Sequence, residues 1–477
     1  MLAARKVETL QEWRDRYGPI TYLNVFGTSY IYINDYKTIT DLFEKRGNIY
    51  SSRPKFVMND LEGWNDWFVV LLPYGPELRS SRQSLHRFLQ PSAIPDYFPE
   101  QTITAHKLAE RLIRSPEDFV EFVRLAAAEL IMKVTYGYDV SEKNDHFIGI
   151  AEKGVDAFSD AQGFYVVNDV PWLQYLPSWL PGMNFLRIAR QGYIDSMNMY
   201  RKPYEMVKEN LEKGDVYQSL TAKMFEMQKD KNGEVSREGE EFIAKVTGVI
   251  YAGGADTTVS SILTFILAMV LYPEVQERAQ EELDTVLGKN ILPTFEDLPK
   301  LKYIDAIRKE CLRWQSVVST PAPHTVSVED EILGYRIPAN SVLMGNIWAI
   351  LRDPKEYPEP DKFIPERFLP NKGKTLPLEP NKVAFSVGRR ICPGRHFAES
   401  SIFIDIATIL ATCKIEKAVD DHGVPIIPKV DYVQQLIRHP TPFKCMIRPR
   451  NGEAHSILQQ AIEKTNIPKK MSKFAVL

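Results

Sequence analysis

Residues 385–396 read FSVGRRICPGRH, which places one cysteine among three arginines and directly ahead of an apolar helical pattern. A thiol near a helix N-terminus and near positive charge has a lowered pKa, so the thiolate is favoured at Cys392. The other three cysteines lie far apart and show no CxxC spacing: Cys311, Cys413 and Cys445. We therefore expect Cys392 to bind a soft, electrophilic partner; the alternative is an inert, buried cysteine.

Five positions of this stretch follow the spacing FxxGxRxCxG: Phe385, Gly388, Arg390, Cys392 and Gly394. The glycines let the backbone fold closely around the sulfur and direct amide N–H groups at it, which stabilises a thiolate. The spacing resembles the haem-ligand loop of the cytochrome P450 family. The resemblance implies that Cys392 is the axial ligand of a haem b iron and that Arg390 neutralises a haem propionate. A thiolate ligand pushes electron density onto iron and favours O–O cleavage.

The overall composition indicates an ordinary globular chain and excludes several classes of protein. The 477 residues carry a formal net charge of −3, so no basic excess exists to neutralise nucleic-acid phosphates. The four cysteines and eight histidines show neither a disulfide framework nor the spacing of a zinc site. We expect reduced thiols facing the cytosol and no nucleic-acid partner.

Two segments bear on membrane association. The first residues, MLAARKVETLQEWRDRYGP, lack the apolar core of a signal peptide and the long run of an anchor, so the chain as given begins like a soluble protein. Residues 246–272 are long enough to span a bilayer, which takes about 20 residues. Asp256 and the pair Gly253 and Gly254 favour a buried central helix instead, because an intramembrane aspartate is costly.

Hydrophobic periodicity predicts long helices in the middle and near the end of the chain. Residues 236–271 form one extended helical pattern, and residues 273–287 begin another with a proline in its first turn. Further helices are expected over residues 302–314 and 395–413. Residues 21–34 alternate β-branched and aromatic side chains around a glycine, which predicts a two-stranded hairpin.

The expected fold class is mainly α with a small β-rich lobe, and the resemblance implies the cytochrome P450 fold. Short apolar strands and Pro-rich loops place the β-rich lobe at about residues 20–55, 320–380 and 415–450, with helices elsewhere. Residues 1–450 are therefore predicted to form a single domain. Residues 451–477 are polar and are expected to be a frayed C-terminal tail.

A pair of charges on one predicted helix has a partner further along the chain. In KECLRW, Glu310 and Arg313 stand at i, i+3 on one helical face, and PERF supplies Arg367. Taken alone, such a pair is most often a solvated ion pair. In this order, ahead of the cysteine loop, the three residues resemble the Glu-Arg-Arg triad of the family, which implies a structural role in haem retention.

The motif GGADTT lies on the predicted central helix. Two adjacent glycines, Gly253 and Gly254, each cost about 1 kcal/mol relative to alanine inside a helix, so a widening or a close ligand approach is expected. The alternative is tight helix packing with threonine bonded back to the helix. The motif resembles the oxygen-activation motif of the family, which implies that Thr257 hydrogen-bonds bound oxygen and that Asp256 feeds it protons through water.

Two more residues are candidates for contact with the haem carboxylates. Arg82 falls where the family has the second residue of a WxxxR pair, although Leu78 stands in place of the tryptophan. His324 matches the position from which an arginine or histidine contacts a propionate. A lone histidine is more often a packing residue, so both interpretations of His324, propionate contact and packing, stay open.

The resemblance covers nearly the whole chain. LFEKRGNIYSSRP, YLPSWLPG and PEVQERAQEELD are similar to the fungal microsomal branch that includes O-methylsterigmatocystin oxidoreductase and tryptamine monooxygenases. That branch has an N-terminal membrane helix and a Pro-rich hinge, which the given sequence does not show. The resemblance implies the cytosolic face of the endoplasmic reticulum for a full-length relative. Residues 171–186, PWLQYLPSWLPGMNFL, suit peripheral membrane contact or an ordinary covered loop.

Electrons must come from another protein, since the chain has neither a GxGxxG dinucleotide fingerprint nor a cysteine cluster for iron–sulfur. The resemblance implies NADPH as the source, NADPH-cytochrome P450 reductase as the partner, cytochrome b5 as an optional second donor, and a monomeric enzyme. Five cations near the cysteine could steer an acidic reductase: Arg79, Arg87, Lys382, Arg389 and Arg395.

The resemblance implies a haem-thiolate monooxygenase that inserts one oxygen atom of O2 into an apolar or aromatic small organic substrate. Six side chains are expected around the substrate, and they do not distinguish a steroid from an indole or a polyketide: Trp67, Phe68, Val249, Val318, Thr320 and Leu436. Two alternatives remain open. One is a haem-thiolate isomerase or dehydratase, against which Asp256 and Thr257 argue; the other is a haem-binding sensor or carrier without turnover.

Overall fold

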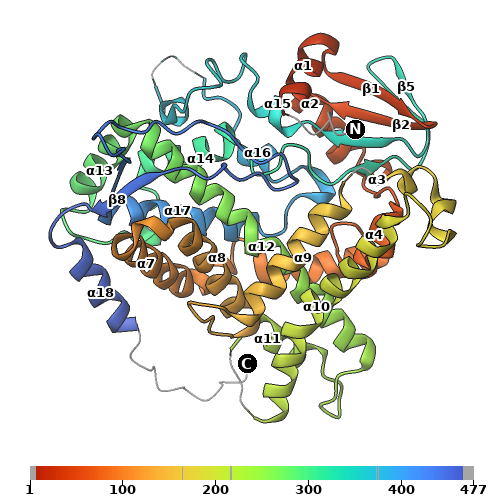
Figure 1. Ribbon diagram of the computed structural model, residues 1–477, viewed down its shortest axis with the longest axis horizontal. Coiled ribbons are helices and arrows are strands. Elements are labelled where there is room, and N and C mark those ends of the chain that lie inside the picture. Colours follow the sequence, from red (N-terminus) through yellow and green to blue (C-terminus); the bar gives the residue numbers. More distant parts are fainter. Residues whose placement is uncertain (1–6, 164, 215–217, 372, 374, 466–477) are drawn as a thin grey trace.

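The computed structural model describes residues 7–163, 165–214, 218–371, 373 and 375–465. Helices form most of the molecule, and a small sheet lies at one edge beside the N-terminal helix α1 (Val7–Tyr17) (Figure 1). The helix α12 (Arg237–Leu271) crosses the middle of the molecule. This arrangement confirms the expected fold class, mainly α with a small β-rich lobe.

The central helix α12 ends where its periodicity predicts and begins one residue later than predicted. Ser236 caps its N-terminus by accepting a hydrogen bond from the Gly239 amide, and two glutamates in the first turn complement the helix dipole. By length and composition this helix could cross a membrane, but 72% of its apolar window is buried inside the protein. The apolar residues of α12 therefore pack inside the protein, as predicted for a buried central helix.

Four helices enclose α12 and form the main core. These are α8 (Phe119–Tyr136), α10 (Asn184–Glu212), α14 (Lys302–Trp314) and α17 (Arg395–Thr412), and each of them packs on it. Apolar side chains from α8, α12, α14 and α17 belong to one buried cluster. The predicted bounds of α14 are correct, and α17 ends one residue before the predicted position.

The sheet joins segments that are far apart in the sequence. Strands β1 (Ile20–Val25) and β2 (Thr28–Ile33) form the predicted hairpin, and β2 pairs in parallel with β6 (Val342–Gly345). Strand β3 (His324–Thr325) completes the order β1-β2-β6-β3. Two further pairs are antiparallel, namely β4 (Asp330–Ile332) with β5 (Tyr335–Ile337) and β7 (Cys413–Lys417) with β8 (Cys445–Pro449).

Shorter elements fill the space around these layers. The remaining α-helices are α2 (Tyr36–Thr40), α3 (Gly47–Tyr50), α4 (Val57–Leu61), α5 (Trp64–Trp67), α6 (Pro76–Leu89), α7 (Phe98–Arg114), α9 (His146–Ala161), α11 (Leu220–Gln228), α13 (Pro273–Val286), α15 (Ile347–Leu351), α16 (Asn381–Ala384) and α18 (Ala454–Thr465).

The helix α18 corrects one expectation. Residues after 450 were expected to be frayed, but Ala454 and Leu458 are buried and the helix packs against α7. An apolar residue in each of two successive turns gives this short helix a face to bury. Residues 466–477, the rest of the expected tail, lie outside the described residues.

Candidate functional site

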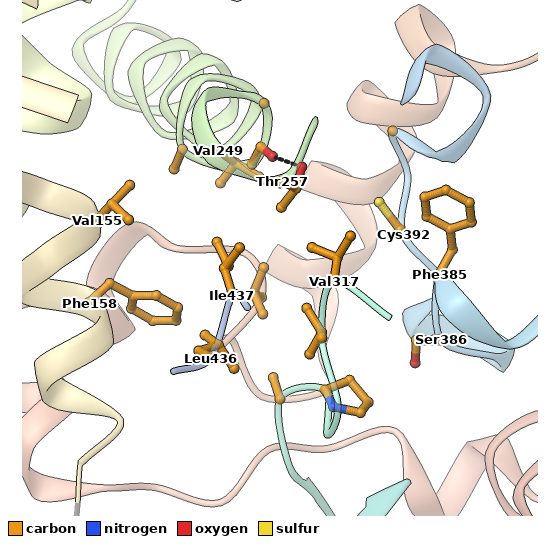
Figure 2. A pocket seen from close by; sticks show the side chains of 18 of the residues that line it. Val155, Phe158, Val249, Thr257, Val317, Phe385, Ser386, Cys392, Leu436 and Ile437 are labelled. Atoms are coloured by element: carbon orange, nitrogen blue, oxygen red, sulfur yellow. Dashed lines mark hydrogen bonds between the residues drawn. The ribbon is translucent and has the colours of Figure 1, made fainter. Parts of the chain in front are cut away.

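A cavity of about 490 Å³ lies between α12 and the loop that carries Cys392. Figure 2 shows Cys392 and Phe385 on one side of it and Thr257 and Val249 of α12 on another. Most of its wall is apolar or aromatic. The structure thus brings the cysteine loop and the central helix, which are more than a hundred residues apart in sequence, to one space.

The cysteine loop is held by backbone contacts. The Cys392 amide donates a hydrogen bond of 2.8 Å to the Phe385 carbonyl. Gly388 has a φ of +68°, and a Cβ on it would lie 1.9 Å from the Phe43 carbonyl oxygen, so no other residue fits there. Gly388 does not line the cavity, so its role is to let the loop adopt this shape.

The electrostatics of Cys392 correct one expectation. Burial raises the pKa of the thiol above its ordinary value, and this outweighs the lowering by the Gly394 amide and by the charges of Arg82 and Arg395. The expected lowered pKa is therefore wrong for the polypeptide alone, because desolvation disfavours the thiolate. A cation in the cavity would reverse the balance, since a coordinated thiol is deprotonated.

Three arginines line one end of the cavity without a carboxylate partner among the described residues: Arg53, Arg82 and Arg390. Arg390 donates to the Ser51 carbonyl at 2.7 Å, and Arg82 donates to the Ile391 carbonyl at 2.7 Å. Burial and the charge of Arg82 lower the pKa of Arg390 to about 9. Three like charges, of which Arg390 is buried and Arg53 and Arg82 are half-buried, repel one another. This end of the cavity is therefore built for an anionic ligand.

Sequence analysis did not find Arg53. Its guanidinium donates to the carbonyls of Val70, Ala322 and Pro323 at 2.8, 2.6 and 2.8 Å. Burial, followed by the charges of Arg390 and Arg82, lowers its pKa well below the ordinary value. No local pattern signals this role, because two of its three partners, Ala322 and Pro323, come from the distant segment before β3.

His324 does not reach the cavity wall. Its ring stacks on Phe43 at a centroid distance of 3.9 Å, and its Nδ1 lies 2.8 Å from the Tyr50 carbonyl oxygen. Burial lowers its pKa well below the ordinary value, and Nε2 has no hydrogen-bond partner within the described residues. The packing reading of His324 has direct support, and its contact with a carboxylate stays a prediction.

The two glycines of α12 have different surroundings. A Cβ on Gly254 would lie 2.5 Å from the Ile131 side chain of α8, whereas a Cβ on Gly253 would meet nothing within 4 Å. Thr257 donates a hydrogen bond of 2.8 Å to the Gly253 carbonyl and faces the cavity (Figure 2). Tight packing therefore accounts for Gly254, while Gly253 leaves open space beside Thr257.

Asp256 points away from the cavity. Its carboxylate is buried, and it accepts hydrogen bonds from His439 Nε2 at 2.9 Å and from Arg124 Nη1 at 3.3 Å. Asp256 does not line the cavity, unlike Thr257 beside it. Sequence analysis missed both partners, since each comes from a distant element.

The triad of charges is assembled as expected. Arg313 donates to both oxygens of Glu310 at 2.6 and 2.8 Å, and Arg367 Nε lies 3.4 Å from Glu310. Arg313 also donates to the carbonyls of Pro360 and Lys362. None of the three charged residues lines the cavity. Their hydrogen bonds instead join α14 to residues 360–367.

Five of the six expected substrate-side residues line the cavity: Phe68, Val249, Val318, Thr320 and Leu436. The prediction for Trp67 is wrong, because its ring is buried against Tyr200 and its Nε1 donates to Ser196 Oγ at 2.9 Å. Phe158 of α9 and Ile437, which the sequence did not single out, project into the cavity (Figure 2).

The cytochrome P450 family model matches residues 3–446. The chain belongs to this family. It is 35% identical to the cytochrome P450 monooxygenase claR of Ampulloclitocybe clavipes, over 94% of this chain and 83% of that protein. It is 37% identical to the tryptamine 4-monooxygenase of Psilocybe cyanescens, over 93% of this chain and 88% of that protein.

A solved structure shows the same fold. A zebra fish cytochrome P450, solved with abiraterone, matches with a TM-score of 0.72 at 19% identity and covers 93% of this chain and 100% of that one. This confirms the expected fold. The family match and the fungal relatives show that the protein is a haem-thiolate monooxygenase. Members of this family bind haem iron and use O2.

The cavity of this cytochrome P450 fits a haem. The arginine cluster lacks the negative charge that two propionates would supply, and Cys392 lacks the cation that would favour its thiolate. The apolar wall between these ends suits a porphyrin ring. Bound haem supplies O2 activation; the chain supplies the ligand, the charge balance and the shape of the pocket.

Proposed function

We propose that this cytochrome P450 acts on a small apolar or aromatic organic substrate. The observation that carries the proposal is the chemistry of the cavity wall. Its lining includes four apolar or aromatic side chains: Phe68, Phe158, Val249 and Val318. Such a wall binds a substrate mainly by excluding water from apolar surface. A monooxygenase then inserts one atom of O2 into that substrate.

An aromatic amine is a specific candidate within this class. One relative is named a tryptamine 4-monooxygenase. At the cavity wall here, Asp169 accepts a hydrogen bond of 3.4 Å from Tyr30, and burial raises the pKa of its carboxyl. A substrate ammonium would relieve this desolvated carboxylate by pairing with it.

Each site residue has a proposed role. Cys392 is the axial ligand, and Phe385, Gly388 and Gly394 shape its loop. Arg82 and Arg390 would pair with the haem propionates, and His324 would donate to one of them if the ring turned from its packed position. Gly253 leaves room for O2, Gly254 lets α12 approach α8 closely, and Asp256 supplies protons to Thr257. The catalytic unit is one domain over residues 1–450, and the structural triad retains the haem: Glu310, Arg313 and Arg367.

Electrons come from NADPH through a separate reductase, with cytochrome b5 as an optional donor. Support comes from a hollow beside the Cys392 loop, whose described lining contains no carboxylate. Arg79, Arg389 and Arg395 line it, while Arg87 and Lys382 are exposed in adjoining segments. An acidic reductase would be steered to this surface.

The enzyme is a monomer that contacts the cytosolic face of the endoplasmic reticulum membrane peripherally. Support comes from Trp172, Tyr175 and Trp179, whose side chains are 61%, 81% and 79% exposed. Exposed aromatic rings of this kind gather at membrane interfaces. Co-sedimentation with phospholipid vesicles should fall when all three are replaced by serine.

A spectral titration tests the substrate class. Candidate steroids, indoles, aryl amines and polyketides are added to the holoenzyme, and displacement of water near the haem is read from the Soret band. We expect apolar and aromatic compounds to bind, and we expect Val318→Phe to weaken binding of the best compound about tenfold, or 1.4 kcal/mol. Val328→Phe, at a position 50% exposed, is the matched control. Response to polar compounds alone would refute the proposal.

A further inference from the structure

Three aromatic side chains of the cavity wall pack against one another in a closed arrangement, which we call the aromatic triangle. Trp64, Phe68 and Phe158 all line the cavity, and Figure 2 shows Phe158 projecting into it from α9. The ring centroids lie 5.7 Å apart for Trp64 and Phe68, 5.0 Å for Trp64 and Phe158, and 4.9 Å for Phe68 and Phe158. All three contacts are edge-to-face, so the tilt of each ring depends on the other two.

Only the indole of the aromatic triangle carries a polar atom that can fix its orientation. Trp64 Nε1 donates a hydrogen bond of 2.9 Å to Glu62 Oε2, and both side chains are buried. A phenyl ring has neither a donor nor an acceptor, so packing alone holds Phe68 and Phe158. The Glu62 carboxyl therefore sets the orientation of the indole, and the indole sets that of the two phenyl rings.

The chain is shaped to bring this carboxyl to the indole. Gly63 has a φ of +71°, which lets the chain turn between Glu62 at the end of α4 and Trp64 at the start of α5. The carboxyl lies against α10 at Gly192, where a Cβ would be 2.5 Å from Glu62 Cδ. Two glycines from separate segments thus leave room for one side chain.

The position of Glu62 is costly for the fold. Its side chain is fully buried, and its Oε1 has no hydrogen-bond partner within the described part of the chain. Burial raises its pKa to about 7 against the lowering by the Trp64 hydrogen bond, and the acidic Asp160 of α9 and Asp195 of α10 raise it further. A buried carboxyl with one hydrogen bond and acidic neighbours lowers stability, which points to a role in function.

We propose that Glu62 is a positioning residue that fixes the Trp64 indole and so makes the aromatic triangle a binding surface for a planar aromatic ring of the substrate. The inference rests on the proposed function and narrows its substrate class from apolar compounds to aromatic ones. A substrate ring gains from the positive edges and negative faces of protein rings only when those rings hold a defined tilt. A saturated ring lacks this quadrupole, so it gains from burial alone.

A first experiment reads the contact between Glu62 and Trp64 without a substrate. Tryptophan labelled with ¹⁵N in the indole is incorporated, and the Trp64 signal of the diamagnetic, carbon monoxide-bound ferrous protein is assigned by its loss in Trp64→Phe. We expect the Nε1–H proton to shift upfield in Glu62→Leu, which removes the acceptor, and to stay in place in Glu62→Gln, whose amide oxygen still accepts. An unchanged signal in Glu62→Leu would overturn the proposal.

A second experiment compares two hydrocarbons that differ in aromaticity. Naphthalene and its saturated counterpart decalin are titrated into the holoenzyme, and the Kd of each is read from the Soret band; we expect the parent to bind naphthalene more tightly. Glu62→Leu and Glu62→Met, which lack the carboxyl acceptor, should weaken naphthalene binding about fivefold and leave decalin binding unchanged. Glu62→Gln should resemble the parent. The matched control is Glu209→Leu, at an exposed position of α10.

The two ligands separate positioning from a loss of structure. A purely structural role of Glu62 would weaken the binding of both hydrocarbons alike, and that result would overturn the proposal. If Glu62 acts through Trp64, Glu62→Leu should have no further effect on naphthalene binding in a Trp64→Phe background. Equal binding of both hydrocarbons by the parent overturns the aromatic preference and leaves the proposed apolar substrate class intact. Binding of neither hydrocarbon refutes that class and this inference together.

Discussion

Replacing Glu310 by glutamine should destabilise the protein more than any surface charge substitution. The Glu310 carboxylate is fully buried and accepts hydrogen bonds from Arg313 Nε and Nη2, from the Ile364 amide at 2.8 Å, and from Arg367. In Glu310→Gln one of the two oxygens becomes an NH2 group, which must face these donors. Two guanidinium groups then lose their only carboxylate within the described residues.

The expected magnitude follows from this geometry. Removing one partner of a buried ion pair costs about 3–5 kcal/mol, because the remaining charge stays desolvated. The matched control is Glu329→Gln, whose ion pair with Arg336 has a comparable length of 2.6 Å but is 54% and 74% exposed. An exposed pair contributes about 0–1 kcal/mol.

Urea unfolding of the holoenzyme, followed by tryptophan fluorescence, measures both variants. Glu310→Gln should lower the free energy of unfolding severalfold more than Glu329→Gln, and it should release haem at a lower urea concentration than the parent. Equal losses in the two variants would refute the reasoning, because burial of the charge would then have no energetic consequence.

Three further predictions concern single residues. Arg53→Gln removes a half-buried cation at the cavity wall and should speed haem transfer to an apo-globin about tenfold or more. The reason is that a hydrogen bond to a charged group contributes about 1.5–3 kcal/mol. Arg79→Gln is the exposed control. Gly388→Ala should yield little protein with the carbon monoxide spectrum of a thiolate-bound haem, because its Cβ would overlap the Phe43 carbonyl; Gly423→Ala, also at positive φ but with open space, should be tolerated better. Burial raises the pKa of Glu62 to about 7, so between about pH 4.5 and 7 the folded state binds a proton that the unfolded state has lost. The free energy of unfolding should therefore fall as pH rises through this range. Glu62→Gln should flatten this dependence, and an unchanged pH profile in the variant would contradict the prediction.

Some features could be predicted because their causes are local. The FxxGxRxCxG spacing identifies the cysteine loop, since a tight turn around a sulfur needs glycines at set intervals. The helix α12 follows from its own cap and its apolar length, and α14 carries Glu310 and Arg313 one turn apart. Each of these statements depends on residues within one segment.

Other features depend on segments that meet only in the folded protein. Arg53 binds carbonyls 269 and 270 residues away, and no neighbouring residue marks it as part of the site. Trp67 looks like a pocket residue by composition, yet Ser196 of α10 holds its indole away from the cavity. The helix α18 is stabilised by burial against α7, which the polar composition of the segment does not show.

The sequence by itself determined the fold class through helical periodicity, and it indicated the reaction class through motifs that resemble the cytochrome P450 family. The role of Cys392 as haem ligand stays a prediction from the spacing of its loop. Only the tertiary structure decided the electrostatics of the site: the raised pKa of the Cys392 thiol, the cluster of uncompensated arginines, and the attachment of Asp256 to His439 and Arg124. The physical reason is that desolvation and Coulomb interactions depend on distance in space, and packing sets that distance independently of separation along the chain.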